Sequence, residues 1–399
     1  MNKDIITIVS TWYGPDTAGG AENAARQLAI ALHTQGHPIE VWSTTARDLF
    51  APTTPHYPRG ESHDAGIIVR RFSIDTPPPD AQIPSYALRF PTIKATLASI
   101  QPDAQELRTI AALAFSYDLL AHIATHSLGR RFLFVPYPLP SSIWGVMLAP
   151  ERSFLLPCMH DEPYAYHRIS RWQLQHARGI LANSAGERDF IVKQYQIKPN
   201  RVCLTRLGID CTAHGNGERF RDRFNIRGPM LFFAGRRDAS KNVPLLLHYV
   251  QEYIIRRQKM VTLVLAGRDP LELSRYQRRF VCDVGFIDEQ TKTDAFAAAD
   301  VFVHAGTQES FAFVLMESWL QSTPTLVNQT CAVTQQAVTE SQGGLTFNDF
   351  ASFAAALDIL LNNPHLNERM GHAGRGYVMT NCQWSDVATR AVNALLRED

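Results

Sequence analysis

One stretch decides the fold: Val301–Asn328, which reads VFVHAGTQESFAFVLMESWLQSTPTLVN. It opens with an apolar run, Asp300–His304, which is short and β-branched enough to predict a buried parallel strand. A loop of small residues follows, and the apolar periodicity of Phe311–Leu320 then predicts a helix. Pro324–Val327 predicts a second buried strand. This is a βαβ crossover whose loop lies at the carboxyl end of the first strand, where open α/β sheets bind their ligands.

The polar residues of this crossover suggest what it binds. The backbone N–H groups of Phe311–Val314 lie at the predicted helix N-terminus, which suits a phosphate. A carboxylate beside that opening would repel the phosphate, so Glu309 is expected to face uncharged donors such as sugar hydroxyls. Glu317 could accept hydrogen bonds from a vicinal diol such as a ribose. The alternative is that Glu309 caps the helix and Glu317 is a solvated surface residue, since two glutamates eight residues apart often occur by chance.

A basic loop, AGRRDASKN, follows another predicted strand, Met230–Ala234. It carries Arg236 and Lys241. A guanidinium fork and a mobile ammonium at one strand end match two adjoining phosphates. A solvated surface loop is the alternative. The diphosphate interpretation is favoured because the helix N-terminus near Phe311 offers the same chemistry.

The amino-terminal segment has a related pattern. Ile5–Ser10 predicts a strand, Trp12–Gly20 a loop and Ala21–Gly36 an amphipathic helix. The order resembles a nucleotide-binding opening but lacks the GxGxxG pattern. Gly19 and Gly20 would let the backbone approach a phosphate or sugar closely, although they could equally be a simple turn.

A histidine marks a further predicted strand end. Phe154–Met159 predicts a strand that delivers His160 at its carboxyl end. An imidazole both donates and accepts hydrogen bonds, so His160 could contact a substrate. A buried structural histidine is the alternative.

The strand–helix alternation stops once and then restarts. Residues 214–228, HGNGERFRDRFNIRG, are polar and charged and predict an interdomain connection. A chain of 399 residues is also long for one ordinary core. We therefore expect two doubly wound α/β domains, residues 1–210 and 211–383, with a C-terminal helix at about 384–399 that returns to the first.

Composition excludes several classes of protein. A hydrophobic content of 45% and a charged content of 19% are typical of a globular protein, and a net charge of +1 gives no reason to expect nucleic acid. The six cysteines lack metal-ligand spacing, so they predict reduced residues in a cytoplasmic protein. The first residues show no signal-peptide pattern. The apolar run 132–150 carries three prolines and is a poor transmembrane candidate, while peripheral contact with the inner face of a membrane stays open.

The ordered set of motifs resembles the retaining glycosyltransferases of family 4. Their GT-B architecture has two Rossmann-like domains facing across a cleft. The likeness runs from about Ile5 to the end, and the phrases MHDEPYAY, ESFAFVLMESW and QSTPTLVN resemble transferases that build bacterial surface polysaccharide or lipopolysaccharide. The motifs are Gly19-Gly20-Ala21-Glu22, His160-Asp161, Asn183-Ser184, Gly208-Ile209-Asp210, Gly235-Arg236 with Lys241, Gly285-Phe286-Ile287, Glu309-x7-Glu317 and Pro324.

This resemblance implies transfer of a hexose from a nucleotide-diphospho-sugar to a saccharide or lipid-linked acceptor. The donor is a co-substrate, and no cofactor is implied. No D-x-D carboxylate pair occurs in the chain, so no obligatory metal is expected. The implied catalytic residues are Arg236 and Lys241 on the diphosphate, Glu309 on the sugar and His160 from the first domain. The implied donor-binding residues are Gly19, Gly20, Phe286, Ile287, Phe311, Ala312, Phe313 and Glu317.

Two positions depart from the family pattern. Ala312 stands where glycine is usual, and its Cβ could crowd the phosphate approach. Ser322 stands at the glycine of the small-Gly-x-Pro segment. Neither removes a charged group, so the sequence predicts an active enzyme. A GT-B sugar-nucleotide epimerase and a non-catalytic nucleotide-sugar-binding partner subunit are the alternatives.

Overall fold

The computed structural model describes residues 4–17 and 19–397. Ala18 of the predicted loop and the last two residues of the predicted C-terminal segment lie outside that range. The chain divides into two compact units, Met1–Gly208 with Trp384–Asp399, and Ile209–Gln383. We call these unit 1 and unit 2. Within the described residues, no helix is long and apolar enough to cross a membrane.

Unit 1 is built on an eight-stranded sheet, parallel except for β3, which pairs antiparallel with β4 at one edge. The hairpin was not expected, because β3 is polar and largely exposed and lacks the apolar alternation of a buried strand. From edge to edge the strands are β3 (Gly60–Asp64), β4 (Ile67–Phe72), β2 (Ile39–Thr44), β1 (Ile5–Ser10), β5 (Arg130–Val135), β6 (Ser153–Leu155), β7 (Gly179–Ala182) and β8 (Val202–Leu204).

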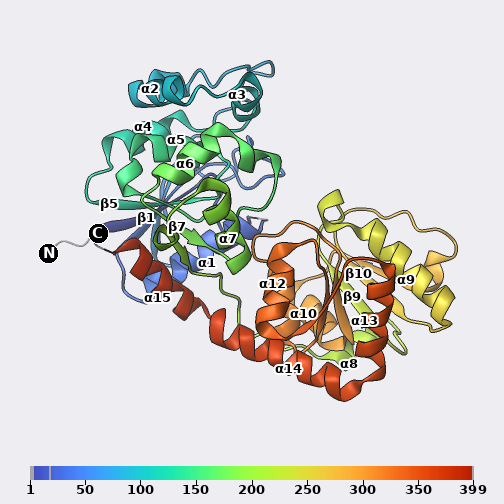
Figure 1. Cartoon of the computed structure of the whole chain (residues 1–399). Coiled ribbons are helices and arrows are strands. Elements are labelled where there is room, and N and C mark those ends of the chain that lie inside the picture. The colour runs from blue at the N-terminus through green and yellow to red at the C-terminus, as the bar shows by residue number, and fades with distance from the viewer. Residues whose placement is uncertain (1–3, 18, 398–399) are drawn as a thin grey trace. The chain divides into compact units, whose positions relative to one another are not determined.

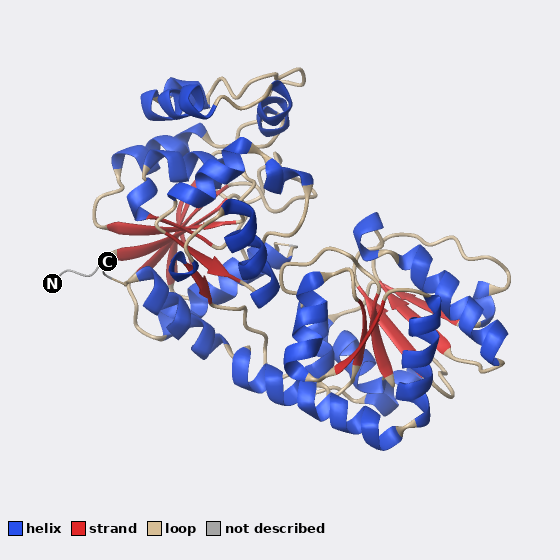
Figure 2. Cartoon of the chain, in the orientation of Figure 1, coloured by secondary structure: helices blue, strands red, loops and turns tan. Residues whose placement is uncertain are grey.

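Helices cover both faces of this sheet (Figure 2). The last helix of the chain belongs here, because α15 packs on α1 and Gln35 Nε2 donates to the Ser385 carbonyl oxygen at 2.7 Å. The helices of unit 1 are α1 (Gly20–Thr34), α2 (Pro91–Ile100), α3 (Ala104–Ala111), α4 (Tyr117–Thr125), α5 (Pro140–Leu148), α6 (Arg168–His176), α7 (Ala185–Tyr195) and α15 (Trp384–Leu395).

Unit 2 contains a six-stranded, wholly parallel sheet in the order β11-β10-β9-β12-β13-β14. The order runs outward in opposite directions from β9 and β12, which is the doubly wound arrangement. Its strands are apolar and buried, as strands covered on both faces must be. They are β9 (Met230–Ala234), β10 (Thr262–Ala266), β11 (Val281–Gly285), β12 (Val301–His304), β13 (Thr325–Asn328) and β14 (Gly344–Phe347).

Both sheets of the chain are thus doubly wound, and the predicted fold class is confirmed. The helices of unit 2 again flank the sheet on two faces (Figure 1). They are α8 (Gly217–Arg223), α9 (Val243–Arg257), α10 (Glu289–Ala298), α11 (Phe313–Leu320), α12 (Ala332–Ser341), α13 (Phe350–Asn362) and α14 (Pro364–Asn381).

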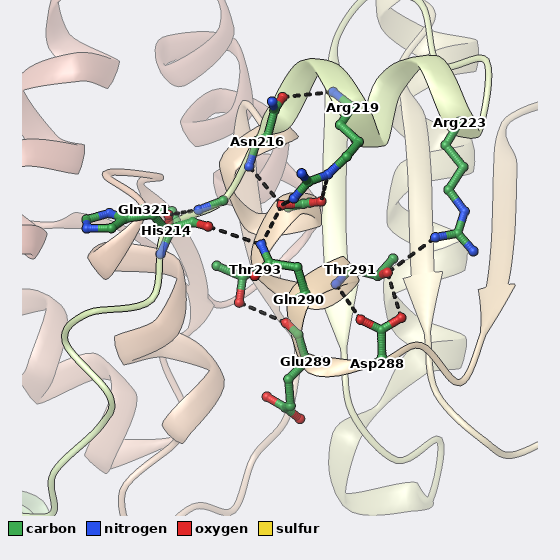
Figure 3. Close-up of polar contacts among 12 residues, drawn as sticks. His214, Asn216, Arg219, Arg223, Asp288, Glu289, Gln290, Thr291, Thr293 and Gln321 are labelled. Carbon is green, nitrogen blue, oxygen red and sulfur yellow. Dashed lines mark hydrogen bonds and ion pairs between the residues drawn. The ribbon is translucent and has the colours of Figure 1, made fainter.

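The polar stretch 214–228, predicted to be an interdomain connection, is instead a docked part of unit 2. It contains α8, which Asn216 caps through its side chain, and which packs on α10. Arg219 forms a two-pronged ion pair with the buried Asp294 of α10, at 2.6 and 2.7 Å (Figure 3). The Gln321 side chain holds the backbone just before α8 through Gly215. The charge of this stretch therefore serves packing within one unit.

Candidate functional site

The predicted diphosphate and sugar residues meet at the switch point of the unit 2 sheet. Arg236 and Lys241 follow β9, and Glu309 follows β12, its parallel neighbour. Ligands of open α/β sheets bind where the strand order reverses, outside the carboxyl ends of the strands. The two loops also touch, since the Thr307 N–H donates to the Ser240 carbonyl oxygen at 3.1 Å.

Glu309 is the centre of this cluster. Its Oε1 atom contacts Lys241 Nζ and also lies 2.9 Å from His304 Nε2. The Glu309 and Lys241 side chains are 14% and 17% exposed, and that of His304 is 2% exposed. Burial raises the pKa of Glu309, but the hydrogen bond and charge of His304, together with Lys241, outweigh it and lower the pKa to about 2. The carboxylate is therefore ionised and largely neutralised by its partners, so it can sit beside a phosphate site without repelling the ligand.

The two neighbouring arginines of the basic loop have different roles. Arg237 is 3% exposed and forms a two-pronged ion pair with Asp283, with one contact of 2.9 Å. Its guanidinium is used within the protein. Arg236 is 61% exposed and pairs with Asp238 at 3.2 Å. Surface pairs of this kind are weak, so Arg236 can exchange its partner for a ligand phosphate.

The helix that follows the loop after β12, α11, begins later than predicted. The expected start at Phe311 is wrong, since α11 begins at Phe313, and Phe311 and Ala312 precede it as buried residues. Ala312 is the reason, because its backbone is left-handed, with φ 65° and ψ 70°, and the helix can start only after it. Of the predicted phosphate-facing groups, only Phe313 and Val314 supply first-turn N–H groups.

Glu317 lies one turn inside α11, where a basic side chain holds one of its oxygens. Lys292 Nζ of α10 contacts Glu317 Oε1 at 3.1 Å and Glu289 at 2.8 Å. Glu317 Oε2 is buried and has no hydrogen-bond partner within the described parts of the chain. Burial raises the pKa of Glu317 despite the opposing charge of Lys292. An unpartnered buried carboxylate oxygen is an acceptor that a ligand hydroxyl could satisfy.

Phe286 and Ile287 follow β11, at the edge of the same sheet. The Phe286 side chain is 66% exposed, and the Arg268 guanidinium lies 4.2 Å from the centre of its ring. β11 is three strand positions from β12, which is roughly 14 Å at the usual strand spacing. A single ligand that reaches both strand ends must therefore be long, as a nucleotide-diphospho-sugar is.

In unit 1, Gly19 and Gly20 stand at the start of α1, after β1. Gly19 has φ 151°, and a Cβ placed on it would lie 2.0 Å from Glu22 Oε2. Burial raises the pKa of Glu22 to about 7. The absent side chain at Gly19 thus makes room for a buried carboxyl group of this chain.

His160 lies in a loop that begins earlier than predicted. The expected strand Phe154–Met159 is wrong, since β6 spans only Ser153–Leu155, and His160 is five residues beyond it. The side chain is 31% exposed, and its Nδ1 atom lies 3.5 Å from Glu162 Oε2. Glu162 itself accepts a hydrogen bond from the Tyr137 hydroxyl at 2.7 Å. His160 is thus partly accessible and backed by an acidic residue.

Two residues of the unit 2 cluster were not predicted as site residues. His304 ends a predicted buried strand, and a polar residue at the carboxyl end of such a strand is a signal that could have identified it. Lys292 lies within a polar helix among other charged residues, and nothing in its sequence surroundings sets it apart. Among the described residues, no group of three or more His, Cys, Asp or Glu side chains could hold a metal ion.

Two family models match consecutive parts of the chain. The model described as Glycosyltransferase Family 4 matches residues 18–213, and the model described as Glycosyl transferases group 1 matches residues 228–363. Together with the architecture, these matches place the chain among the family 4 glycosyltransferases of the GT-B fold.

The chain is also similar to curated proteins. D-inositol 3-phosphate glycosyltransferase 2 of Catenulispora acidiphila is 28% identical over 243 residues, which cover 54% of this chain and 57% of that protein. Glycogen synthase of Mycobacterium tuberculosis is 24% identical over 414 residues, which cover 98% and 94%. The match with the first of these relatives, and with the Frankia alni protein of the same function, spans just over half of their length.

Solved structures share the fold across nearly the whole chain. Sucrose-phosphate synthase from Thermosynechococcus elongatus superposes with a TM-score of 0.69 at 19% identity, covering 98% of this chain and 97% of that one. WaaG, a glycosyltransferase involved in lipopolysaccharide biosynthesis, superposes with a TM-score of 0.65 at 14% identity, covering 98% of this chain and 99% of that one. Anabaena HepE in complex with UDP gives 0.67 at 12%, with the same coverage. At these identities the likeness shows the fold.

Proposed function

We propose that this protein is a retaining glycosyltransferase that moves a hexose from a nucleotide-diphospho-sugar to a saccharide or lipid-linked acceptor. The observation that carries the proposal is the cluster of Lys241, Glu309 and His304 at the switch point of unit 2, with Arg236 exposed in the same loop as Lys241. The cluster combines cations that can exchange their carboxylate partners for a diphosphate with a carboxylate that can accept from sugar hydroxyls.

The leaving diphosphate carries the charge that the site must stabilise. Arg236 and Lys241 supply two cations, and the first-turn N–H groups of α11 supply aligned dipoles. The N–H groups are fixed by the helix, whereas the two side chains turn from their carboxylate partners to the diphosphate. We propose that this charge replaces a divalent metal, which makes the transfer metal-independent.

The donor residues then divide by chemistry. Glu309 accepts from a sugar hydroxyl, and Glu317 accepts from the ribose through Oε2. Backbone groups at Phe286 and Ile287 meet the base. For unit 1, the family resemblance is the support for proposing that Gly19 and Gly20 serve the diphosphate and His160 the sugar. Retention proceeds by acceptor attack on the face that the diphosphate leaves, assisted by a diphosphate oxygen, with no covalent glycosyl-enzyme.

We place the reaction in surface polysaccharide or lipopolysaccharide synthesis, at the cytoplasmic side of the membrane. The phrase ESFAFVLMESW supports this, as does the fold shared with WaaG. Relatives named for inositol phosphate and glycogen chemistry make a soluble phosphorylated or glucan acceptor the competing choice.

A product assay tests the proposal. Purified protein is incubated with UDP-glucose, UDP-N-acetylglucosamine or GDP-mannose, with and without a membrane glycolipid fraction, and products are resolved by mass spectrometry and anomeric NMR. The proposal expects acceptor-dependent release of nucleoside diphosphate with retained anomeric configuration, unchanged by EDTA. Conversion of the donor without an acceptor would instead indicate an epimerase. Donor binding without turnover in any mixture would indicate a non-catalytic subunit.

A further inference from the structure

The contacts of Glu309 are concentrated on one oxygen. Lys241 and His304 both approach Oε1, and within the described residues no hydrogen bond reaches Oε2. An ionised carboxylate only accepts hydrogen bonds, so His304 donates through Nε2. The carboxylate is thus held by one atom while the other is left for a ligand.

The two partners of Oε1 differ in freedom. Lys241 is a flexible ammonium in a loop, and a diphosphate would compete for it. His304 is 2% exposed at the end of β12, and its ring is confined by the loop that follows. A Cβ placed on Gly306 would lie 2.8 Å from His304 Cε1 and 3.1 Å from the Ser240 carbonyl oxygen. The histidine therefore stays in place when the lysine turns to a ligand.

We propose that His304 is a positioning residue: it holds Glu309 Oε1 so that Oε2 is presented to a hydroxyl of the donor sugar while Lys241 engages the diphosphate. The role rests on the proposed function. It predicts that His304 matters for the sugar part of the donor and not for the nucleoside diphosphate part, because the ring reaches the ligand only through Glu309.

Nδ1 of the same ring adds an independent constraint. It is buried and has no hydrogen-bond partner within the described ranges. With Nε2 as the only bonded nitrogen, loss of the contact to Glu309 would leave the whole ring without a polar partner. Buried polar groups without partners are costly, so the contact to Glu309 is the one that orients the ring.

The binding test compares wild type with His304→Leu and His304→Gln. Leucine removes the hydrogen-bond donor to Glu309, whereas glutamine keeps an N–H group of similar reach. The affinities of UDP and UDP-glucose, and of GDP and GDP-mannose, are measured by calorimetry. We expect His304→Leu to weaken binding of the complete donor about tenfold and that of the matching nucleoside diphosphate less than twofold, with His304→Gln recovering most of the loss. His365→Leu, an exposed site on α14, is the matched control.

Three results would overturn the proposal. One is unchanged donor affinity in His304→Leu. Another is an equal loss for the donor and the nucleoside diphosphate, which would mean collapse of the loop. The third is a further loss when His304→Leu is added to Glu309→Ala, because a residue that acts through Glu309 has nothing left to position in that background.

A ligand-free measurement separates this inference from the proposed function. Selective ¹⁵N-histidine spectra should show an Nε2-protonated ring whose signal disappears in His304→Gln and shifts in Glu309→Gln but not in Glu317→Gln. If no nucleotide-sugar binds, the proposed function fails and this spectrum alone decides the His304–Glu309 arrangement. A His304 signal that does not respond to Glu309→Gln overturns it.

Discussion

Two buried glutamates, one in each unit, have opposite acid–base properties. Glu187 of unit 1 is 1% exposed, and its carboxyl accepts from the backbone N–H groups of Met159 and Asn183. Burial raises its pKa to about 8. Glu309 of unit 2 is 14% exposed and so largely removed from solvent, yet its pKa falls to about 2. The difference is that Glu309 has Lys241 and His304 as partners, whereas Glu187 has uncharged N–H groups.

The comparison shows that the partners, and not the depth of burial, determine the charge of a carboxylate. Glu187 bridges the start of α7 and the loop before His160, which is a structural task for which a neutral acid suffices. Glu309 stands where a phosphate and a sugar are expected, and it is kept ionised by Lys241, which a ligand can also engage, and by His304, which stays in place. A site that must hold charge supplies the opposite charge alongside it.

The largest expected effect comes from the cations around Glu309. Arg236→Ala and Lys241→Ala should each lower transfer by about 100-fold or more, because each removes charge that stabilises the leaving diphosphate. Steady-state kinetics with the donor identified by the product assay measures this. Arg227→Ala, a 77% exposed arginine of the same unit, should be neutral. Undiminished transfer by Arg236→Ala would contradict the site.

The pH dependence of the two units should have opposite signs. Glu309 has a folded pKa below its unfolded value of about 4.5, so its contribution is present above pH 4.5 and is lost as the pH falls toward 2. Glu187 has a folded pKa above its unfolded value, so stability is lost as the pH rises from about 4.5 through 8. At about 1.4 kcal/mol per pKa unit, the free energy of unfolding should change by about 3 kcal/mol for Glu309 and about 5 kcal/mol for Glu187.

Hydrogen exchange followed by mass spectrometry reads the two units separately. Glu309→Gln should weaken the loss of stability at acid pH in peptides of unit 2. Glu187→Gln should weaken the loss of stability at alkaline pH in peptides of unit 1. Each variant should leave the pH dependence of the other unit unchanged. If both variants change the stability at the same end of the pH range, the two glutamates do not differ in the way described.

A smaller effect is expected at Glu317, whose Oε1 is held by Lys292. Glu317→Ala should weaken nucleoside diphosphate binding about tenfold through loss of the ribose acceptor. Lys292→Met should weaken nucleoside diphosphate binding by a smaller factor, since it removes the partner that orients Glu317 but not the carboxylate that accepts from the ribose. Titration calorimetry with UDP and GDP checks the order. If Lys292→Met were worse than Glu317→Ala, the assignment of the ribose to Glu317 would be wrong.

The smallest effect concerns the backbone that leads from Glu309 into α11. Ala312 has φ 65°, which glycine adopts without steric cost, so Ala312→Gly should stabilise unit 2 by about 1 kcal/mol. Ala355→Gly, at an exposed position within α13, should destabilise by a similar amount and serves as the opposite-sign control. Urea unfolding measures both. A loss of stability in Ala312→Gly would show that its Cβ packs productively.

Local pattern predicted the fold because the strands of unit 2 are short apolar runs that end in polar loops. It placed Arg236, Lys241 and Glu309 at strand ends, and the parallel pairing of β9 with β12 brings those ends together. The sequence pattern misplaced the start of α11. The backbone at Ala312 is left-handed because of its surroundings in the folded chain, and helical periodicity carries no sign of this. The same holds for Ser322, where φ is 59° and a glycine is usual.

The interactions that set the charge and orientation of the site residues could not be predicted from the local sequence pattern. The contacts of His304 and Lys292 with the two glutamates depend on packing between residues far apart in sequence or on opposite sides of a loop. The α8 segment is different, since Asn216 ahead of an alternating charged and aromatic run was a visible capping signal that the composition obscured.

We propose that the switch point of unit 2 binds a nucleotide-diphospho-sugar through Arg236 and Lys241 without a metal. Thermal unfolding of wild type and of Arg236→Ala/Lys241→Ala is followed with UDP-, GDP-, ADP- and dTDP-sugars, each with and without EDTA. We predict that one nucleotide family raises the wild-type midpoint equally in both conditions and leaves the double variant unchanged. No shift with any donor, an equal shift in the double variant, or a shift abolished by EDTA would contradict the claim.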